Sequence, residues 1–165
     1  MKLTLIAAML AATALLAGCK DAGPAKPETT ALSDSAGNAA ALTLTVYKTP
    51  SCGCCKKWVL HLEQQGVVAH TKNYDDLSGI KARYGISPQY YSCHTAVSEQ
   101  GYAFEGHIPA KYIRQFLAES HPDAIGLSVP AMPLGSPGME GPRKDPFDVL
   151  LVQVNGSTKV FKHYN

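Results

Sequence analysis

The segment YKTPSCGCCKKW, residues 47–58, joins a strand-like pattern to a helical pattern and carries three cysteines. Residues 42–47, Leu-Thr-Leu-Thr-Val-Tyr, alternate apolar and polar side chains, which predicts a strand with one buried face. Thr49-Pro50-Ser51 ends this strand, and a helical pattern begins near Cys54. The apolar residues of that helix form one stripe: Cys55, Trp58, Val59 and Leu62. The cysteine motif therefore lies where a strand turns into a helix.

The elements that follow this helix repeat the change from strand to helix. They are a strand over 67–71, a short helix capped by Asp75 or Asp76 and closed by Gly85, a hairpin with strands 95–98 and 102–105, and a helix with Pro109 in its first turn. With a cysteine motif between the first strand and the first helix, this order predicts an α/β, thioredoxin-like three-layer fold.

Two C-terminal pieces lie outside that pattern. Residues 126–146 form a long loop rich in proline and glycine, and a loop of this length in a compact domain is usually functional or disordered. Residues 148–154 and 158–164 flank Asn155-Gly156, which predicts a β-hairpin. We therefore expect the thioredoxin-like unit to end in a Pro/Gly loop and a hairpin.

The three clustered thiols occupy the N-terminal turn of the first predicted helix. Unpaired N–H groups and the helix dipole stabilise anions there, so depressed thiol pKa values are expected. Cys52 and Cys55 are three residues apart and can form a disulfide, whereas Cys54 is expected to point elsewhere, since adjacent helical residues diverge by about 100°. Thiolates attack disulfides and also bind metals, so this motif alone leaves a redox pair and a metal site open.

A fourth thiol, Cys93, precedes the third predicted strand together with His94. In thioredoxin-like proteins this turn lies against the cysteine motif and usually carries a cis-proline, but Pro88 comes several residues too early. A thiol and an imidazole in that turn would bring four thiols to one place, which is a ligand set for soft metals. The alternatives are a buried small residue for Cys93 and a capping or core histidine for His94.

Copper fits this ligand set better than zinc. Structural zinc sites usually use paired C-x-x-C arms or helically spaced histidines, and only one arm is present. Thiolates can bridge several Cu(I) ions, so a small copper cluster is expected. Further candidate ligands are His107 and the two loop methionines, Met132 and Met139, although loop methionines often pack against a core. The other histidines, His61, His70, His121 and His163, are interpreted as surface or structural residues.

The N-terminus carries the pattern of a secretory signal. Met1-Lys2 is a short basic start, an apolar run follows over 3–16, and Leu16-Ala17-Gly18-Cys19 resembles a bacterial lipoprotein cleavage site with Cys19 as the lipid-bearing residue. The alternative is an ordinary signal peptide that contains a cysteine. Lys20 stands where an aspartate would favour inner-membrane retention, so an outer-membrane anchor is expected.

These features predict three regions: a signal peptide over 1–18, a flexible tether over 19–41 and a copper-binding domain over 42–165. The tether is rich in Ala, Pro, Thr, Ser and Gly and is too poor in large apolar residues to fold by itself. Loss of the signal peptide removes one lysine and lowers the formal charge from +2 to +1. This balance offers no reason to expect a nucleic-acid partner.

Four motifs together resemble the CopG-type periplasmic copper-resistance proteins. They are Thr49-Pro50-Ser51-Cys52-Gly53-Cys54-Cys55, Ser92-Cys93-His94-Thr95, Glu105-Gly106-His107-Ile108-Pro109-Ala110 and Gly135-Ser136-Pro137-Gly138-Met139-Glu140. The resemblance covers about residues 43–161. It implies a thioredoxin-like fold, copper bound through Cys52, Cys54, Cys55 and Cys93, and a role in envelope copper resistance with Cu(I)/Cu(II) redox change.

The expected function is therefore copper binding for resistance or homeostasis, by a periplasm-facing lipoprotein that holds Cu(I) in a cysteine-bridged site. Its expected partners are copper ions and envelope copper-export or redox proteins, and its contact with the membrane is the lipid anchor alone. Whether it turns over as a copper oxidoreductase is left open by the sequence. Two alternatives are a thiol-disulfide oxidoreductase that uses Cys52 and Cys55 and a passive metal buffer.

Overall fold

The structure, a computed structural model, describes residues 41–164. The predicted signal peptide, the lipidation site Cys19 and the tether up to residue 40 lie outside the described residues. Within residues 41–164, no helix combines the length and the apolar character that a membrane span requires.

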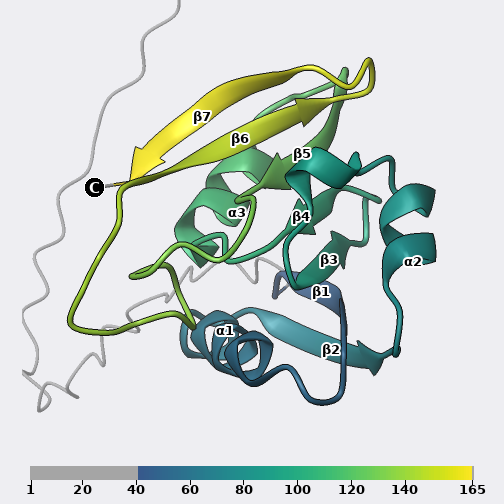
Figure 1. The fold of residues 1–165 in the computed structure, drawn as a ribbon. Helices are drawn as coiled ribbons and strands as arrows, with labels where there is room; N and C mark the ends of the chain where they lie inside the picture. Colours follow the sequence, from purple (N-terminus) through teal and green to yellow (C-terminus); the bar gives the residue numbers. More distant parts are fainter. Residues whose placement is uncertain (1–40, 165) are drawn as a thin grey trace, which may run out of the picture. The chain divides into compact units, whose positions relative to one another are not determined.

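The helices are interspersed among the strands in the first two thirds of the domain, and within the described residues its C-terminal third contains strands and a long loop but no helix (Figure 1). The elements are β1 (Thr43–Lys48), α1 (Gly53–Gln64), β2 (Val68–Asn73), α2 (Ser78–Arg83), the 3-10 turn η1 (Pro88–Tyr90), β3 (His94–Ser98), β4 (Ala103–Glu105), α3 (Ala110–Ala118), β5 (Ala124–Ser128), β6 (Phe147–Gln153) and β7 (Thr158–Tyr164). The strands form one mixed sheet in the order β2-β1-β3-β4-β5-β6-β7.

The first four strands and three helices form a thioredoxin-like unit, as predicted from the element order. β1 and β2 are parallel and are joined by α1, whereas β3 is antiparallel to both β1 and β4. Contacts divide the helices between the two faces of the sheet. Trp58 of α1 donates to the carbonyl of Ile108 beside α3, whereas Lys81 of α2 reaches Thr95 and Glu105. Three layers result, with α1 and α3 on one face and α2 on the other.

The hydrophobic core lies between the sheet and the α1–α3 layer. The stripe predicted for the first helix is buried at all four positions, since Cys55, Trp58, Val59 and Leu62 all face inward. Trp58, Val59 and Leu62 pack with buried residues of β1, such as Leu44 and Val46, and of α3, such as Ile113 and Phe116. Alternation in a strand and a helical stripe, both readable in the sequence, therefore build this interface.

The predicted start of the Pro/Gly loop at Gly126 is wrong, because residues 124–128 form the buried strand β5, parallel to β4. Gly126 sits inside this strand at φ +147, where an added Cβ would lie 1.7 Å from the carbonyl oxygen of Ala103. A short strand with an internal glycine carries little strand pattern. The loop proper covers 129–146. The predicted hairpin exists as β6 and β7, which extend the sheet beyond β5.

Candidate metal centre

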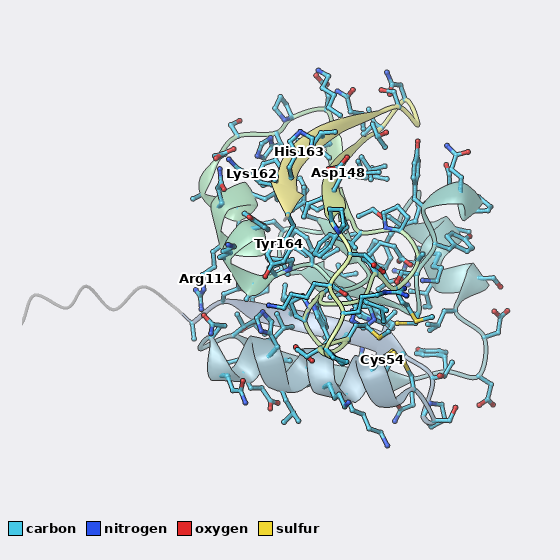
Figure 2. All side chains as sticks on the ribbon, turned by 60° about the vertical axis from the view of Figure 1, so that its left-hand side comes forward. Cys54, Arg114, Asp148, Lys162, His163 and Tyr164 are labelled. Carbon is cyan, nitrogen blue, oxygen red and sulfur yellow. A yellow bond between two sulfur atoms is a disulfide. The ribbon has the colours of Figure 1, made fainter. Side chains whose placement is uncertain are left out.

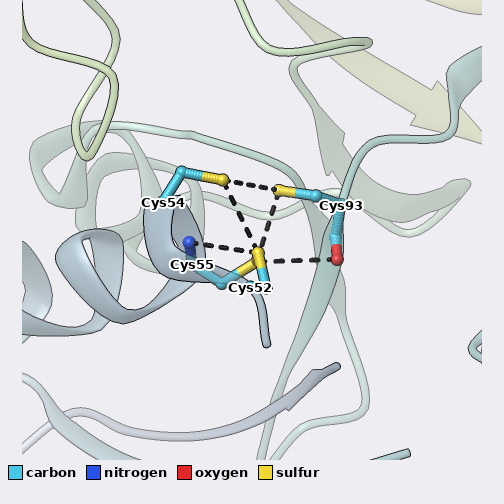
Figure 3. A group of neighbouring side chains, drawn as sticks. All are labelled: Cys52, Cys54, Cys55 and Cys93. Atoms are coloured by element: carbon cyan, nitrogen blue, oxygen red, sulfur yellow. Dashed lines mark hydrogen bonds between the residues drawn. A yellow bond between two sulfur atoms is a disulfide. The ribbon is translucent and has the colours of Figure 1, made fainter. Parts of the chain in front are cut away.

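Four cysteine sulfur atoms meet between the N-terminus of α1 and the turn that precedes β3 (Figure 3). Cys52 is the N-cap of α1, Cys54 and Cys55 lie in its first turn, and Cys93 directly precedes β3. The four sulfurs lie within 4.8 Å of one another. Cys52 and Cys55 form a disulfide, while Cys54 and Cys93 are the thiols of this group.

Cys54 lies within the cluster, so the expectation that its side chain points elsewhere is wrong. Its sulfur is 3.5 Å from that of Cys52 and 3.8 Å from that of Cys93, and the Cys55 sulfur is 3.4 Å from that of Cys93. The 100° rule applies between helical residues, but Cys52 is an N-cap in extended conformation. Its sulfur folds back to accept the amide N–H of Cys55 at 3.3 Å, which brings it beside Cys54.

His107 presents a ring nitrogen to Cys93. Its Nε2 lies 3.0 Å from the Cys93 sulfur, and its Nδ1 lies 2.7 Å from the carbonyl oxygen of Pro137. Because a carbonyl only accepts, Nδ1 carries the proton and the lone pair of Nε2 faces the sulfur. A carbonyl that fixes the tautomer in this way is a common support for metal-binding histidines.

His94 lies deeper, fully buried against Trp58 at a ring-centroid distance of 4.3 Å. Its Nδ1 is 3.3 Å from the Cys93 sulfur, and its Nε2 has no hydrogen-bond partner within the described part of the chain. Burial lowers the pKa of His107, and burial, with smaller contributions from neighbouring His107 and Lys81, holds the pKa of His94 well below its usual range. Both rings are therefore neutral at physiological pH, the state in which histidine binds metals.

Cys93 belongs to two clusters of possible metal ligands. One is the cluster of four cysteines, and the other consists of Cys93, His94 and His107. Burial, and secondarily the neighbouring Cys54, raises the pKa of the Cys93 thiol to about 12. Cys93 lies outside α1, so the helix N-terminus does not offset this burial. A metal that binds Cys93 must therefore displace a firmly held proton.

A buried ion pair supports the turn that carries Cys93. The Glu105 carboxylate pairs with Lys81, accepts the hydroxyl of Thr95 at 2.6 Å and accepts the amide N–H of Ser92 at 2.6 Å. Lys81 also donates to the hydroxyl of Thr95 at 3.1 Å. Sequence reasoning missed this network. A usable signal was present, since Lys81 falls on the inward side of a short helix and Glu105 falls in an apolar strand.

The loop over 129–146 reaches the cluster through Met132. The Met132 sulfur lies 3.9 Å from that of Cys54, and Met132 is 46% exposed, so it forms the outer edge of the site. Cys54 itself, the other partner in this contact, is labelled in Figure 2. Met139 is half-buried and exchanges backbone hydrogen bonds with Ser136 and Gly135. Across residues 41–164, no comparable sulfur contact is found for Met139.

The donor set suits a soft, thiophilic ion. Seven of the eight predicted ligands come together here: Cys52, Cys54, Cys55, Cys93, His94, His107 and Met132. With the Cys52–Cys55 disulfide reduced, they offer thiolate, thioether and imidazole donors, which copper in its Cu(I) state favours. The carboxylate of Glu105, which supports the turn with Cys93, is occupied by Lys81, Thr95 and Ser92. Buried His94 adds a further nitrogen beside this group, its Nδ1 at 3.3 Å from the Cys93 sulfur.

Fold and site together define a thioredoxin-like protein whose cysteine motif is part of a potential metal centre. A family model described as "Protein of unknown function, DUF411" matches residues 90–139. Two solved structures, described as copper resistance protein CopG in form 2 and form 1, are each 38% identical to this chain. Form 2 covers 76% of this chain and 99% of its own at a TM-score of 0.71; for form 1 the values are 75%, 98% and 0.70.

The chain belongs to the CopG family of copper resistance proteins. A comparison with curated proteins gave no match. The predicted family resemblance and the predicted fold class are confirmed, and the cysteine cluster supports a metal-binding role in copper resistance.

Proposed function

We propose that this protein protects the cell envelope from copper by holding Cu(I) in a site bridged by Cys52, Cys54, Cys55 and Cys93. The observation that carries the proposal is the convergence of these four sulfurs within 4.8 Å, with a neutral His107 nitrogen at 3.0 Å from Cys93. Once the Cys52–Cys55 disulfide is reduced, four thiolates this close repel one another, and bound cations relieve that repulsion. Thiolates that bridge ions accommodate more than one Cu(I) in so small a volume.

The residues of the site have different roles in binding copper. The thiolates of α1 and Cys93 supply the bridging ligands, and the imidazole of His107 is held in its binding tautomer by the carbonyl of Pro137. Met132 covers the solvent side, while buried His94 and Trp58 exclude water from the inner side. Bound copper supplies a one-electron change between Cu(I) and Cu(II). We propose that the chain uses this change to process copper rather than only to store it.

The proposal includes a location at the periplasmic face of the outer membrane, supported by the lipoprotein-like sequence that ends in Cys19 and by Lys20 after it. Its partners there are copper ions and envelope copper-export or redox proteins. A Cys19→Ser variant should lose the lipid, pass from the membrane fraction to the soluble fraction of the envelope, and keep its copper binding. Retention of that variant in the membrane fraction would contradict the anchor.

Anaerobic titration of the fully reduced protein tests the proposed site. Cu(I) supplied against a competing chelator should bind in preference to Zn(II) and at more than one ion per chain, because clustered soft thiolates bridge Cu(I) more readily than they surround one zinc ion. One zinc per chain with no uptake of copper would contradict the copper cluster.

A thiol-disulfide oxidoreductase is the second candidate function, favoured by the disulfide between Cys52 and Cys55. Cys54→Ser separates the two candidates, because it keeps that pair but removes a bridging ligand. We expect the Cys54→Ser variant to bind fewer copper ions per chain than the wild type. We expect both the variant and the wild type to be poor at reducing insulin. Unchanged copper loading in the variant, together with insulin reduction by the wild type, would favour the oxidoreductase.

Copper processing and passive buffering differ in their response to oxidation. Copper-loaded protein should resist thiol alkylation and give a paramagnetic Cu(II) signal on oxidation that disappears on re-reduction. Cys93→Ala should weaken both effects, because it removes the thiol contributed from outside α1. If copper-loaded protein gives no Cu(II) signal through oxidation and re-reduction, passive metal buffering is the remaining function.

A further inference from the structure

The disulfide divides the four clustered cysteines into two pairs with different chemistry. Cys52 and Cys55 are bonded to each other and offer no thiolate, whereas Cys54 and Cys93 are thiols. The two thiols come from different segments, the first turn of α1 and the turn that precedes β3. Their sulfurs nevertheless lie 3.8 Å apart, so the disulfide leaves a complete thiol pair in place.

The separation of this pair is that of two ligands on one ion. Metal–sulfur bonds of about 2.3 Å that meet at a trigonal or tetrahedral angle place their sulfurs roughly 3.8–4.0 Å apart. The Cys54 and Cys93 sulfurs therefore already have the spacing that a single metal ion requires. Neither helix nor turn needs to move for both to bind it.

Two further donors flank the pair, one on each side. The Nε2 lone pair of His107 lies 3.0 Å from the Cys93 sulfur, and the Met132 sulfur lies 3.9 Å from the Cys54 sulfur. Met132 is 46% exposed, so this side of the pair is open to an arriving ion. Two thiols, a thioether and an imidazole nitrogen form a soft set that selects Cu(I).

We propose that the disulfide form of the protein binds one Cu(I) through Cys54 and Cys93, with His107 and Met132 as additional ligands. This inference rests on the proposed function and states how the same site is regulated. Binding releases the protons of the two thiols and leaves the disulfide intact. Reduction of the Cys52–Cys55 disulfide by an external dithiol takes two electrons and two protons, converts that dithiol to a disulfide, and frees two more ligands. The redox state of one cysteine pair thus sets the copper capacity of the protein.

The test compares Cu(I) uptake by the same purified chain in two redox states. Peptide mapping after alkylation first establishes that the oxidised sample carries the Cys52–Cys55 disulfide and free Cys54 and Cys93. Cu(I), supplied anaerobically with a competing chelator, should then bind to the oxidised protein at one ion per chain and protect both free cysteines from alkylation. The reduced protein should bind more than one ion.

The outcomes separate this inference from the proposed function. Uptake by the reduced protein alone would overturn the one-copper site and leave the proposed function standing, whereas no uptake in either state would overturn both. More than one ion per oxidised chain, or a map in which Cys54 and Cys93 are not the free thiols, would also overturn the inference.

Variants of the loop and the cluster test the ligands. In the oxidised protein, Cys54→Ser should abolish Cu(I) binding, and Met132→Leu should weaken it on the order of tenfold. Val160→Ala, at an apolar side chain of similar exposure (48%) on β7, is the control and should leave the affinity unchanged. Thermal unfolding checks that each variant is folded. Equal effects of Met132→Leu and Val160→Ala, or undiminished binding by Cys54→Ser, would exclude this ligand set.

Discussion

Gly138 is the residue at which the loop over 129–146 touches the N-terminal turn of α1. It adopts φ +87, and an added Cβ would lie 2.7 Å from the carbonyl oxygen of Cys54 and 2.9 Å from the amide nitrogen of Trp58. The same Cβ would lie 3.3 Å from Nδ1 of His107. A side chain at this position would therefore push the loop away from both the cysteine turn and the histidine.

Gly138→Ala should destabilise the domain by about 2–4 kcal/mol, the sum of a left-handed backbone penalty and overpacking against fixed backbone atoms. Because Pro137 fixes the tautomer of His107, the copper affinity of the folded variant should fall as well. Urea unfolding and chelator competition measure the two effects. Gly141→Ala is the matched control, since nothing lies within 4 Å of its added Cβ. Similar losses in both variants would contradict this role for Gly138.

At the scale of elements, α1 and α3 satisfy each other's end groups. His61 of α1 accepts the first amide N–H of α3, that of Ala110, on its Nε2 at 3.1 Å. Arg114 of α3 donates to the carbonyl of Gln65 at the C-terminal end of α1, at 2.7 Å. Such contacts give hydrogen-bond partners to the backbone N–H and C=O groups that a helix leaves unpaired at its ends. They hold the His107–Ala110 segment, and with it His107, against the helix that carries the cysteines.

The cap provided by His61 predicts a dependence of stability on pH. Burial lowers the pKa of His61, and the charge of Glu140 acts in the opposite direction. Because the folded state prefers the neutral ring, the stabilisation is complete above the unfolded pKa of about 6.5 and is lost as pH falls through the folded pKa. Unfolding midpoints of the metal-free protein between pH 8 and pH 5 should show this loss.

His61→Gln isolates the contribution of this ring, because the amide oxygen still accepts the Ala110 N–H but does not titrate. His94 and His107 also have lowered pKa values and stay in both proteins, so the variant should lose less stability on acidification than the wild type. Equal pH dependence of the two proteins would exclude His61 as a titrating cap.

The α2 layer acts on the site through the ion pair of Lys81 and Glu105. Burial raises the pKa of the Glu105 carboxyl, while the charge of Lys81 lowers it. Lys81→Met leaves that carboxyl buried without its partner and should cost about 3–5 kcal/mol. The double variant Lys81→Met/Glu105→Gln should recover part of this loss. A double-mutant cycle by urea unfolding measures the coupling, and strictly additive losses would contradict it.

At the scale of the whole molecule, sequence reasoning succeeded where one residue pattern determines one local structure. The helical stripe from Cys55 to Leu62, the hairpin predicted over 95–105 and the Asn155-Gly156 turn each depend on neighbours in sequence, and the corresponding elements are present. Strand β5 was missed because burial on both faces removes alternation, and Gly126 interrupts the run. Such features are missed because they depend on contacts between residues that are distant in sequence.

The candidate site shows the same division. The grouping of the four cysteines was predicted from the order of elements, which places the turn that precedes β3 against the N-terminus of α1. The contact between the sulfurs of Cys52 and Cys54 was not predicted, because it depends on the extended conformation of Cys52. The contact of Met132 with Cys54 spans 78 residues and follows from the path of a loop. Direct ligation of copper by any of the eight candidate residues stays a prediction.

The site joins three segments that are distant in sequence: the first turn of α1, the turn with Cys93 and the loop with Met132. A ligand that binds only the folded arrangement stabilises it by about 2.7 kcal/mol at 100 times its Kd. For a domain of this size we expect Tm to rise by roughly 8–13 °C when Cu(I) is added to the reduced protein. Scanning calorimetry under anaerobic conditions, at several chelator-buffered Cu(I) concentrations, measures this rise.

Cys93→Ala tests whether that stabilisation comes from joining segments rather than from metal on α1 alone. The variant keeps three thiols in one helical turn, but it loses the thiol contributed from outside α1. Cu(I) held by α1 alone can bind the unfolded chain almost as well, because Cys52, Cys54 and Cys55 are neighbours in sequence. We therefore expect the variant to bind Cu(I) with little increase in Tm. A rise equal to that of the wild type would show that the copper site does not connect α1 to the rest of the domain.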